Sequence, residues 1–316
     1  MRRAELSAQQ STLLMVSLIM RYLILFLVLL CLHGAEAAED SLKNIHYIER
    51  QGVDAKLTSL DLYVPDGEIE NCPVMVMIHG GGWSIGDKTN RTFVEPKTTW
   101  FLDRGFVVAS INYRLSPAVT HPAHIEDVCA ALAWVETNIS AHGGDPKRVY
   151  LLGHSAGAHL AALAAVDRER VIAAGASPSH LAGVILLDGA GYNVPKQAKD
   201  ALLPRVKTMY LQAFTENEAT QRDASPTLKK MENPPPFLIL HAQRRANARE
   251  QSQALQEALQ GAGGKAAVVE VANKNHFQMN AAYLTKAPTV QNAFINIREN
   301  NAVVTNLVSE KVLSAD

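Results

Sequence analysis

Continuous apolar runs alternate along this chain with segments in which apolar residues recur at helical spacing. Six runs are typical of strands that are buried on both faces of a sheet. They cover residues 73–78, 106–111, 149–152, 183–187, 237–240 and 267–271. Two earlier segments, 44–50 and 58–64, alternate apolar and polar residues and predict an antiparallel pair. The alternation predicts an α/β fold, with a mostly parallel central sheet flanked by helices on both faces.

One stretch, residues 189–235, lacks the strand pattern and contains only short helical pieces such as 206–214. We expect it to form a small lid inserted over one edge of the sheet. The chain contains no internal repeat, low-complexity tract or charge run, so residues 38–316 are predicted to form a single domain that carries this insertion.

The N-terminal segment 1–37 reads as a signal peptide rather than as part of the fold. An apolar run over 23–32 is followed by Ala35-Glu36-Ala37, the small-x-small pattern of a cleavage site, which predicts cleavage after Ala37. Met20 is an alternative start to Met1. An uncleaved anchor is the other interpretation, because residues 11–32 reach the roughly 20 residues that span a bilayer. Cleavage predicts a secreted or periplasmic protein without a stable membrane partner.

Charge and composition exclude several classes of partner. The chain has 30 basic and 31 acidic residues, so no basic excess points to nucleic acid. Three cysteines are too few for a disulfide scaffold. His121 and His124 stand three residues apart without a third ligand, and a metal site is therefore not expected.

A candidate nucleophile, Ser155, lies in Gly153-His154-Ser155-Ala156-Gly157, between the strand at 148–152 and a helical stretch at 159–165. This is a G-x-S-x-G motif in the strand–turn–helix context that it requires. The glycines permit a tight turn that exposes the serine hydroxyl above a helix N-terminus.

A second motif, His79-Gly80-Gly81-Gly82-Trp83, follows the strand at 73–78. Its glycines expose backbone N–H groups that can point at an oxyanion beside Ser155. The N–H groups of Gly81, Gly82 and Ala156 are the predicted oxyanion-hole donors. No G-x-G-x-x-G pattern is present, and no Lys-Ser/Thr pair directly follows the three glycines, so nucleotide binding is not favoured.

A candidate general base, His276, comes a few residues after the last predicted strand. Functional groups of an open parallel sheet gather at the carboxyl ends of its strands, where Ser155 is also expected. The chain order, nucleophile before base, is that of hydrolases built around a G-x-S-x-G turn.

These motifs carry a family resemblance that covers about residues 42–285. Together with Asn112–Pro117, His121-Pro122 and Gly143–Pro146, they resemble the α/β-hydrolase superfamily. Within it, the chain is similar to hormone-sensitive-lipase-like carboxylesterases, especially their feruloyl/acetyl-esterase-type branch. The resemblance implies a Ser–acid–His triad that hydrolyses small or carbohydrate-linked acyl esters through an acyl-enzyme, without a metal or organic cofactor. Kynurenine formamidases share the glycine loop, but export argues against their intracellular substrate.

The acid of the triad is where the chain departs from that family. The family's acid follows the strand at 237–240, but here the loop 242–248 contains no carboxylate, and Arg244 or Arg245 stands at the expected position. Asp188, at the end of the preceding strand, is the first alternative, and Glu250 is the second. The loop favours a triad without a charged third member. The competing hypothesis to an active esterase is therefore a weakened hydrolase fold used for binding. Acyl and alcohol specificity and oligomeric state stay open.

Overall fold

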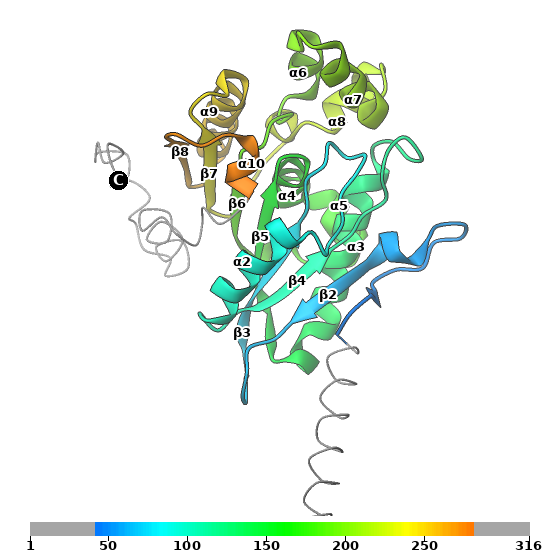
Figure 1. Cartoon of the computed structure of the whole chain (residues 1–316), viewed down its shortest axis with the longest axis vertical. Coiled ribbons are helices and arrows are strands. Elements are labelled where there is room, and N and C mark those ends of the chain that lie inside the picture. Colours follow the sequence, from blue (N-terminus) through cyan, green and yellow to red (C-terminus); the bar gives the residue numbers. More distant parts are fainter. Residues whose placement is uncertain (1–41, 281–316) are drawn as a thin grey trace, which may run out of the picture. The chain divides into compact units, whose positions relative to one another are not determined.

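An eight-stranded sheet runs through the part of the chain that the computed structural model describes, residues 42–280 (Figure 1). The strand order is β1-β2-β4-β3-β5-β6-β7-β8, with antiparallel pairing of β1 with β2 and of β2 with β4, and parallel pairing elsewhere. The strands are β1 Ile45–His46, β2 Ser59–Tyr63, β3 Cys72–Ile78, β4 Val107–Ile111, β5 Gly144–His154, β6 Leu181–Leu187, β7 Phe237–Ala242 and β8 Ala266–Val271. The predicted opening antiparallel pair and mostly parallel sheet are confirmed.

Helices cover the sheet and connect its parallel strands. The helices are η1 Ala55–Thr58, α2 Arg91–Leu102, α3 Ala123–Asn138, η2 Ile139–His142, α4 Ala156–Val166, α5 Arg168–Ala173, η3 Pro178–His180, α6 Val194–Asp200, α7 Pro204–Phe214, α8 Glu218–Asp223, η4 Pro226–Leu228, α9 Ala246–Gly261 and α10 His276–Asn280. All 11 residues of α4 are buried, because this helix packs against β5 and β6 on one side and α3 on the other.

One face of the sheet shares a core with α2 and α10. Met75 and Met77 of β3 pack there with Phe93 and Phe101 of α2 and Met279 of α10, all fully or almost fully buried. Alternate residues of a strand point to opposite faces, so the intervening Val74 and Val76 belong to the other face. Burial of both faces explains why these strands appear as unbroken apolar runs.

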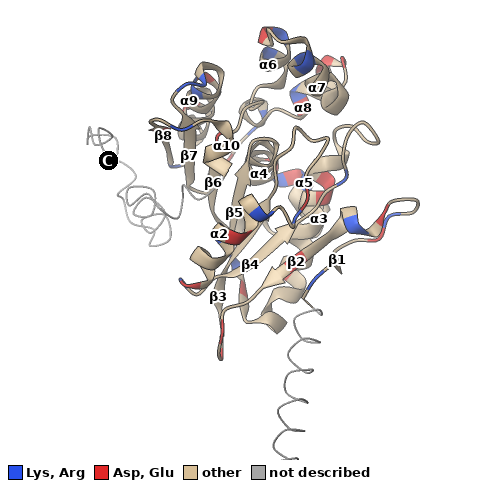
Figure 2. Ribbon diagram, in the orientation of Figure 1, with Lys and Arg blue, Asp and Glu red and all other residues tan. Residues whose placement is uncertain are grey.

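The segment between β6 and β7 contains α6, α7, α8 and η4 and no strand, which matches the helical pattern expected for 189–235. Figure 1 shows these helices gathered beyond the end of the sheet where β5 and β6 finish. In the view of Figure 2 they carry both basic and acidic side chains rather than charges of one sign.

The predicted signal peptide, residues 1–37, lies outside the described residues. Among residues 42–280, no helix is both long enough and apolar enough to cross a membrane.

Candidate active site

Ser155 occupies the sharp turn between β5 and α4. Its backbone has φ 56° and ψ −117°, a conformation that non-glycine residues rarely adopt. The backbone N–H of Ser155 donates to Leu187 O at 3.0 Å, which ties the turn to the end of β6. This strained strand–turn–helix geometry is what the G-x-S-x-G motif predicts for a nucleophile.

The two glycines of the motif leave room for that turn. A Cβ atom at Gly153 would lie 2.2 Å from Gly157 O, and one at Gly157 would lie 2.1 Å from Ile78 O. Since real Cβ atoms do not approach backbone oxygens that closely, both positions require glycine. Glycine is required at both positions because β5, α4 and β3 pack closely together, since neither glycine has a positive φ.

The glycine loop after β3 leaves its N–H groups without partners. Neither the N–H of Gly81 nor that of Gly82 donates a hydrogen bond to any group among residues 42–280. Gly81 has φ 120°, and a Cβ atom there would lie 1.9 Å from Ile85 O, so the loop shape excludes a side chain. Ala156, the first residue of α4, has an N–H without an intrahelical acceptor. The three predicted oxyanion donors are therefore unpaired.

The helical insertion holds this loop in place through aromatic contacts. Trp83 is buried, and its indole ring lies 5.3 Å from Tyr210 and 4.7 Å from Phe214, both in α7. Its Nε1–H donates to His159 Nδ1 at 3.3 Å. Met209 of the same helix occupies the space where a Cβ of Gly82 would lie, with Sδ at 2.5 Å. We infer that α7 forms a fixed wall against the oxyanion loop.

His276, the first residue of α10, lies against a carboxylate. Its Nδ1 atom is 2.7 Å from Asp188 Oδ2, although 88 positions separate the two residues in sequence. Asp188 directly follows β6 and is fully buried, whereas the His276 side chain is 28% exposed. A donor at Nδ1 leaves Nε2 free to accept a proton, which is the tautomer that a general base needs.

Asp188 is held as a charged group by its surroundings. Burial raises the pKa of this carboxyl, but the hydrogen bond with His276, the charge of Arg245 and the N–H of Ala242 together lower that pKa below its ordinary value. The Ala242 N–H donates to Asp188 Oδ1 at 2.9 Å, and the backbone N–H of Asp188 donates to Leu240 O. The end of β7 thus fixes both the charge and the position of the acid.

These contacts correct the expectation of a triad without a charged third member. The structure brings a carboxylate to His276, from the strand before the one that carries it in the family pattern. Glu250, the other alternative, is 61% exposed and pairs with Lys196 at 3.1 Å. It therefore belongs to the surface of α9 and not to the site.

Arg245 also contacts the Asp188–His276 pair. The sequence left open whether Arg244 or Arg245 stands at the position of the family's acid. Its Nη1 donates to both the backbone oxygen and Oδ2 of Asp188, each at 2.7 Å, and lies 2.7 Å from His276 Nδ1. Arg244, by contrast, is exposed. The position of the family's acid is thus filled by a cation that contacts the relocated acid.

Two further residues that sequence reasoning did not assign support the position of α10. His154 Nε2–H donates to His276 O at 3.0 Å, and the two rings lie 4.6 Å apart. Burial, with a smaller contribution from His276, lowers the pKa of His154 to about 3, so this ring is neutral. Lys97 of α2 donates to Asn280 O at the other end of α10. The signal for His154 was its place beside Ser155, but its side chain points at the α10 backbone.

The structure does not join every predicted site residue. Within the described range, Ser155 Oγ makes no hydrogen bond to His276, a contact that often forms only with substrate bound. No group of three or more histidine, cysteine or acidic side chains among residues 42–280 is placed to hold a metal ion.

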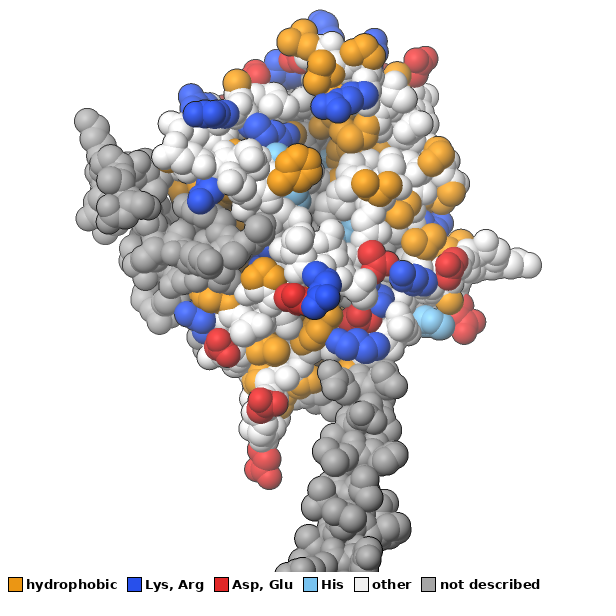
Figure 3. All heavy atoms as spheres, in the orientation of Figure 1, with side chains coloured by type: hydrophobic (Ala, Val, Ile, Leu, Met, Phe, Trp, Pro, Cys, Tyr) orange, Lys and Arg blue, Asp and Glu red, His pale blue; other side chains and the backbone are white. Residues whose placement is uncertain are grey.

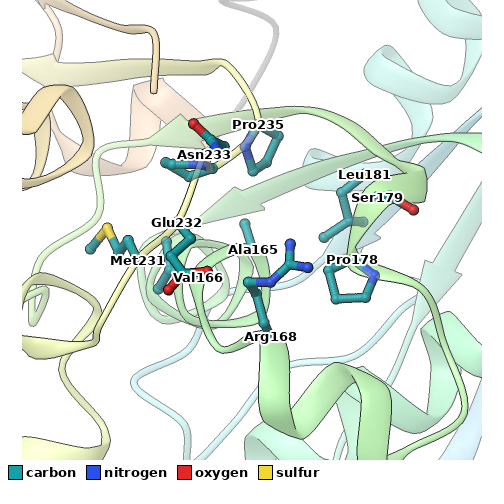
Figure 4. Close-up of a pocket in the computed structure, with 11 residues that line it drawn as sticks. Ala165, Val166, Arg168, Pro178, Ser179, Leu181, Met231, Glu232, Asn233 and Pro235 are labelled. Atoms are coloured by element: carbon teal, nitrogen blue, oxygen red, sulfur yellow. The ribbon is translucent and has the colours of Figure 1, made fainter. Parts of the chain in front are cut away.

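A hollow of about 180 Å³ lies elsewhere, at the amino ends of β6 and β7 (Figure 4). Leu181, Pro235, Arg168 and Met231 are among its lining residues. Since Ser155, Asp188 and His276 follow the carboxyl ends of their strands, this hollow is not part of the candidate site.

Comparison with known families matches residues 60–259, more than half of the chain, to BD-FAE. The chain belongs to the BD-FAE family. The matched range contains Ser155, Asp188 and the glycine loop, while His276 follows it. The resemblance to the α/β-hydrolase superfamily and its carboxylesterases is therefore confirmed.

Curated relatives of this BD-FAE chain include two named esterases. It is 32% identical over 216 residues to Esterase LipQ of Mycobacterium tuberculosis, covering 65% of this chain and 50% of LipQ. It is 30% identical over 237 residues to isoprenylcysteine alpha-carbonyl methylesterase ICME of Arabidopsis thaliana, covering 71% of this chain and 54% of ICME. The chain spans about half the length of these relatives.

Solved structures support the same fold. Esterase B from Lactobacillus rhamnosis aligns with a TM-score of 0.62 at 22% identity, over 90% of this chain and 94% of that protein. The α/β-hydrolase fold predicted for this BD-FAE member is confirmed.

Proposed function

We propose that this BD-FAE member is a serine carboxylesterase. The observation that carries the proposal is the Asp188–His276 contact of 2.7 Å, formed beside a strained serine and a loop of unpaired N–H donors. Nucleophile, base, acid and oxyanion donors are the complete set of groups that acyl transfer requires.

In the proposed reaction, Ser155 Oγ attacks the ester carbonyl carbon while His276 Nε2 accepts its proton. The carbonyl oxygen becomes an oxyanion, which the N–H groups of Gly81, Gly82 and Ala156 stabilise. The intermediate then expels the alcohol, which takes the proton from His276, and the acyl group stays on Ser155. Water repeats the sequence and releases the carboxylic acid.

We propose small or carbohydrate-linked acyl esters as substrates, on the basis of the esterase branch that the sequence resembles. Parts of histidine side chains are visible between hydrophobic and basic side chains on the face shown in Figure 3, and the side chain of His276 is 28% exposed, so the base is accessible to solvent. The fixed wall formed by α7 limits the space beside the oxyanion loop, which favours short acyl groups.

The test is a panel of p-nitrophenyl esters from acetate to decanoate, with acetylated xylan and an aryl formamide, followed by mass spectrometry after treatment with a p-nitrophenyl phosphonate. We expect turnover of the shorter esters and a single phosphonyl group on Ser155. Turnover of the formamide alone would support the formamidase alternative. The second candidate is a hydrolase fold retained for binding, which the contact of Arg245 with the base supports. The absence of both turnover and labelling would favour this candidate.

We further propose that the protein is exported, on the basis of the apolar run and the Ala35-Glu36-Ala37 pattern. Expression of the full chain in a bacterial host should yield an exported protein that begins at Ala38. Intact-mass measurement distinguishes this from a membrane-associated protein that begins at Met1 or Met20, which would support an anchor.

A further inference from the structure

Three atoms of the site form a triangle whose hydrogen bonds cannot all be made at once. Asp188 Oδ2, His276 Nδ1 and Arg245 Nη1 lie 2.7 Å from one another. The ionised carboxylate oxygen can only accept and the guanidinium nitrogen can only donate, while the imidazole nitrogen does either, according to its tautomer.

With a proton on Nδ1, His276 and Arg245 both donate to Asp188, and the Nδ1–Nη1 contact joins two donors. Without that proton, Nη1 can donate to Asp188 Oδ2 and to His276, but its two hydrogens then no longer serve the backbone oxygen of Asp188. The Oδ2–Nδ1 contact then joins two acceptors. In each tautomer, two of the three contacts are therefore hydrogen bonds, and the third contact is repulsive. A carboxylate alone would favour only the first tautomer, because it offers Nδ1 an acceptor and no donor.

Only the first tautomer leaves a lone pair on Nε2 for the proton of Ser155. The second places a proton on Nε2, and His276 then cannot act as a base. Arg245 also sets a positive charge beside the imidazolium that forms as Ser155 attacks, and like charges disfavour one another.

The titratable groups near His276 come from several neighbouring elements. His154, at the end of β5, is neutral, and Lys97 of α2 adds a second basic group near α10. Asp188 after β6 is the acid that both His276 and Arg245 share. Arg245 itself is fixed by its backbone, because its N–H donates to Ala242 O and its carbonyl accepts from the first turn of α9.

Resting on the proposed esterase function, we propose that Arg245 is a positioning residue that attenuates the base. By offering Nδ1 a donor, it raises the share of the Nε2–H tautomer of His276, and its charge opposes the imidazolium. It does so by competing for the Nδ1 atom and the Oδ2 atom, not by touching the substrate. The enzyme consequently operates below the rate that Ser155, His276 and Asp188 would support without it.

The test compares Arg245→Gln with wild type in kcat and KM. We expect kcat to rise about tenfold with little change in KM, equivalent to about 1.4 kcal/mol of barrier. Arg245→Lys, which keeps a positive charge, should show a smaller rise, and Arg244→Gln, at the exposed neighbour, should show none.

A second measurement does not depend on turnover. Proton–nitrogen correlation spectra of ¹⁵N-histidine-labelled protein report which ring nitrogen of His276 carries the proton. We expect a mixture in wild type and the Nδ1–H form in Arg245→Gln. An unchanged or lower kcat with unchanged tautomers would overturn the role of Arg245. Absent turnover in every variant, with the tautomer shift present, would instead count against the esterase function.

Discussion

Ser155→Ala is expected to lower kcat on a short p-nitrophenyl ester by about 10⁵–10⁶-fold, the scale of nucleophile loss in serine hydrolases. The reason is chemical, since no other hydroxyl is placed by a strained turn beside unpaired N–H donors in the described site. Stopped-flow or long-time absorbance assays on the purified protein measure the loss.

A matched control keeps that result specific. Ser179→Ala removes a hydroxyl near the amino end of β6, beside the hollow of Figure 4, and should leave kcat unchanged. Both variants should unfold at temperatures close to wild type, because alanine retains the Cβ atom at each position. Activity of Ser155→Ala within tenfold of wild type would show that the hydrolysis proceeds through another group.

The parallel strands were predictable because their signal is local. A strand buried on both faces must be apolar at successive positions, as β3 and β6 are, and no other part of the chain needs to be known. The beginning of β5 was not predictable in this way. Its first residues include Asp145, Lys147 and Arg148, which extend past the buried part of the sheet and therefore do not show the apolar pattern.

Helix α2 was not predictable from its local sequence either. It contains Pro96 in its interior and buries the charged Lys97, so neither propensity nor apolar spacing indicates a helix there. Its stability comes from packing of residues such as Phe93 and Phe101 into the shared core, and that packing depends on strands distant in sequence.

The residues of the candidate site differ in the same way, because some are predictable from the local sequence and others are not. Ser155 and the glycine loop are encoded within a few residues, so their roles could be predicted from motif and context. The acid could not, because the contact of Asp188 with His276 depends on how far two side chains reach across neighbouring strand ends. The triangle with Arg245 joins three residues that are distant in sequence but close in space, and no spacing along the chain predicts such contacts.

Asp188→Asn is expected to lower kcat by about 10⁴-fold, or about 5–6 kcal/mol of barrier, as loss of the triad acid does in a serine protease. The amide preserves shape, and its oxygen can still accept from Ala242 N–H. Its NH₂ group then faces His276 Nδ1 and Arg245 Nη1. With only donors around it, Nδ1 accepts, and the proton moves to Nε2, where it blocks the base.

Two further readouts separate this loss from damage to the fold. Glu250→Gln, which removes the exposed acid that pairs with Lys196, should leave kcat unchanged. The native pKa of Asp188 lies below its ordinary value, so its ionised form stabilises the fold at neutral pH, and that contribution disappears as pH falls through the native pKa. The stability difference between wild type and Asp188→Asn should therefore shrink in acid. A folded Asp188→Asn variant that retains most of its activity would show that Asp188 holds Arg245 and β7 in place without serving the base.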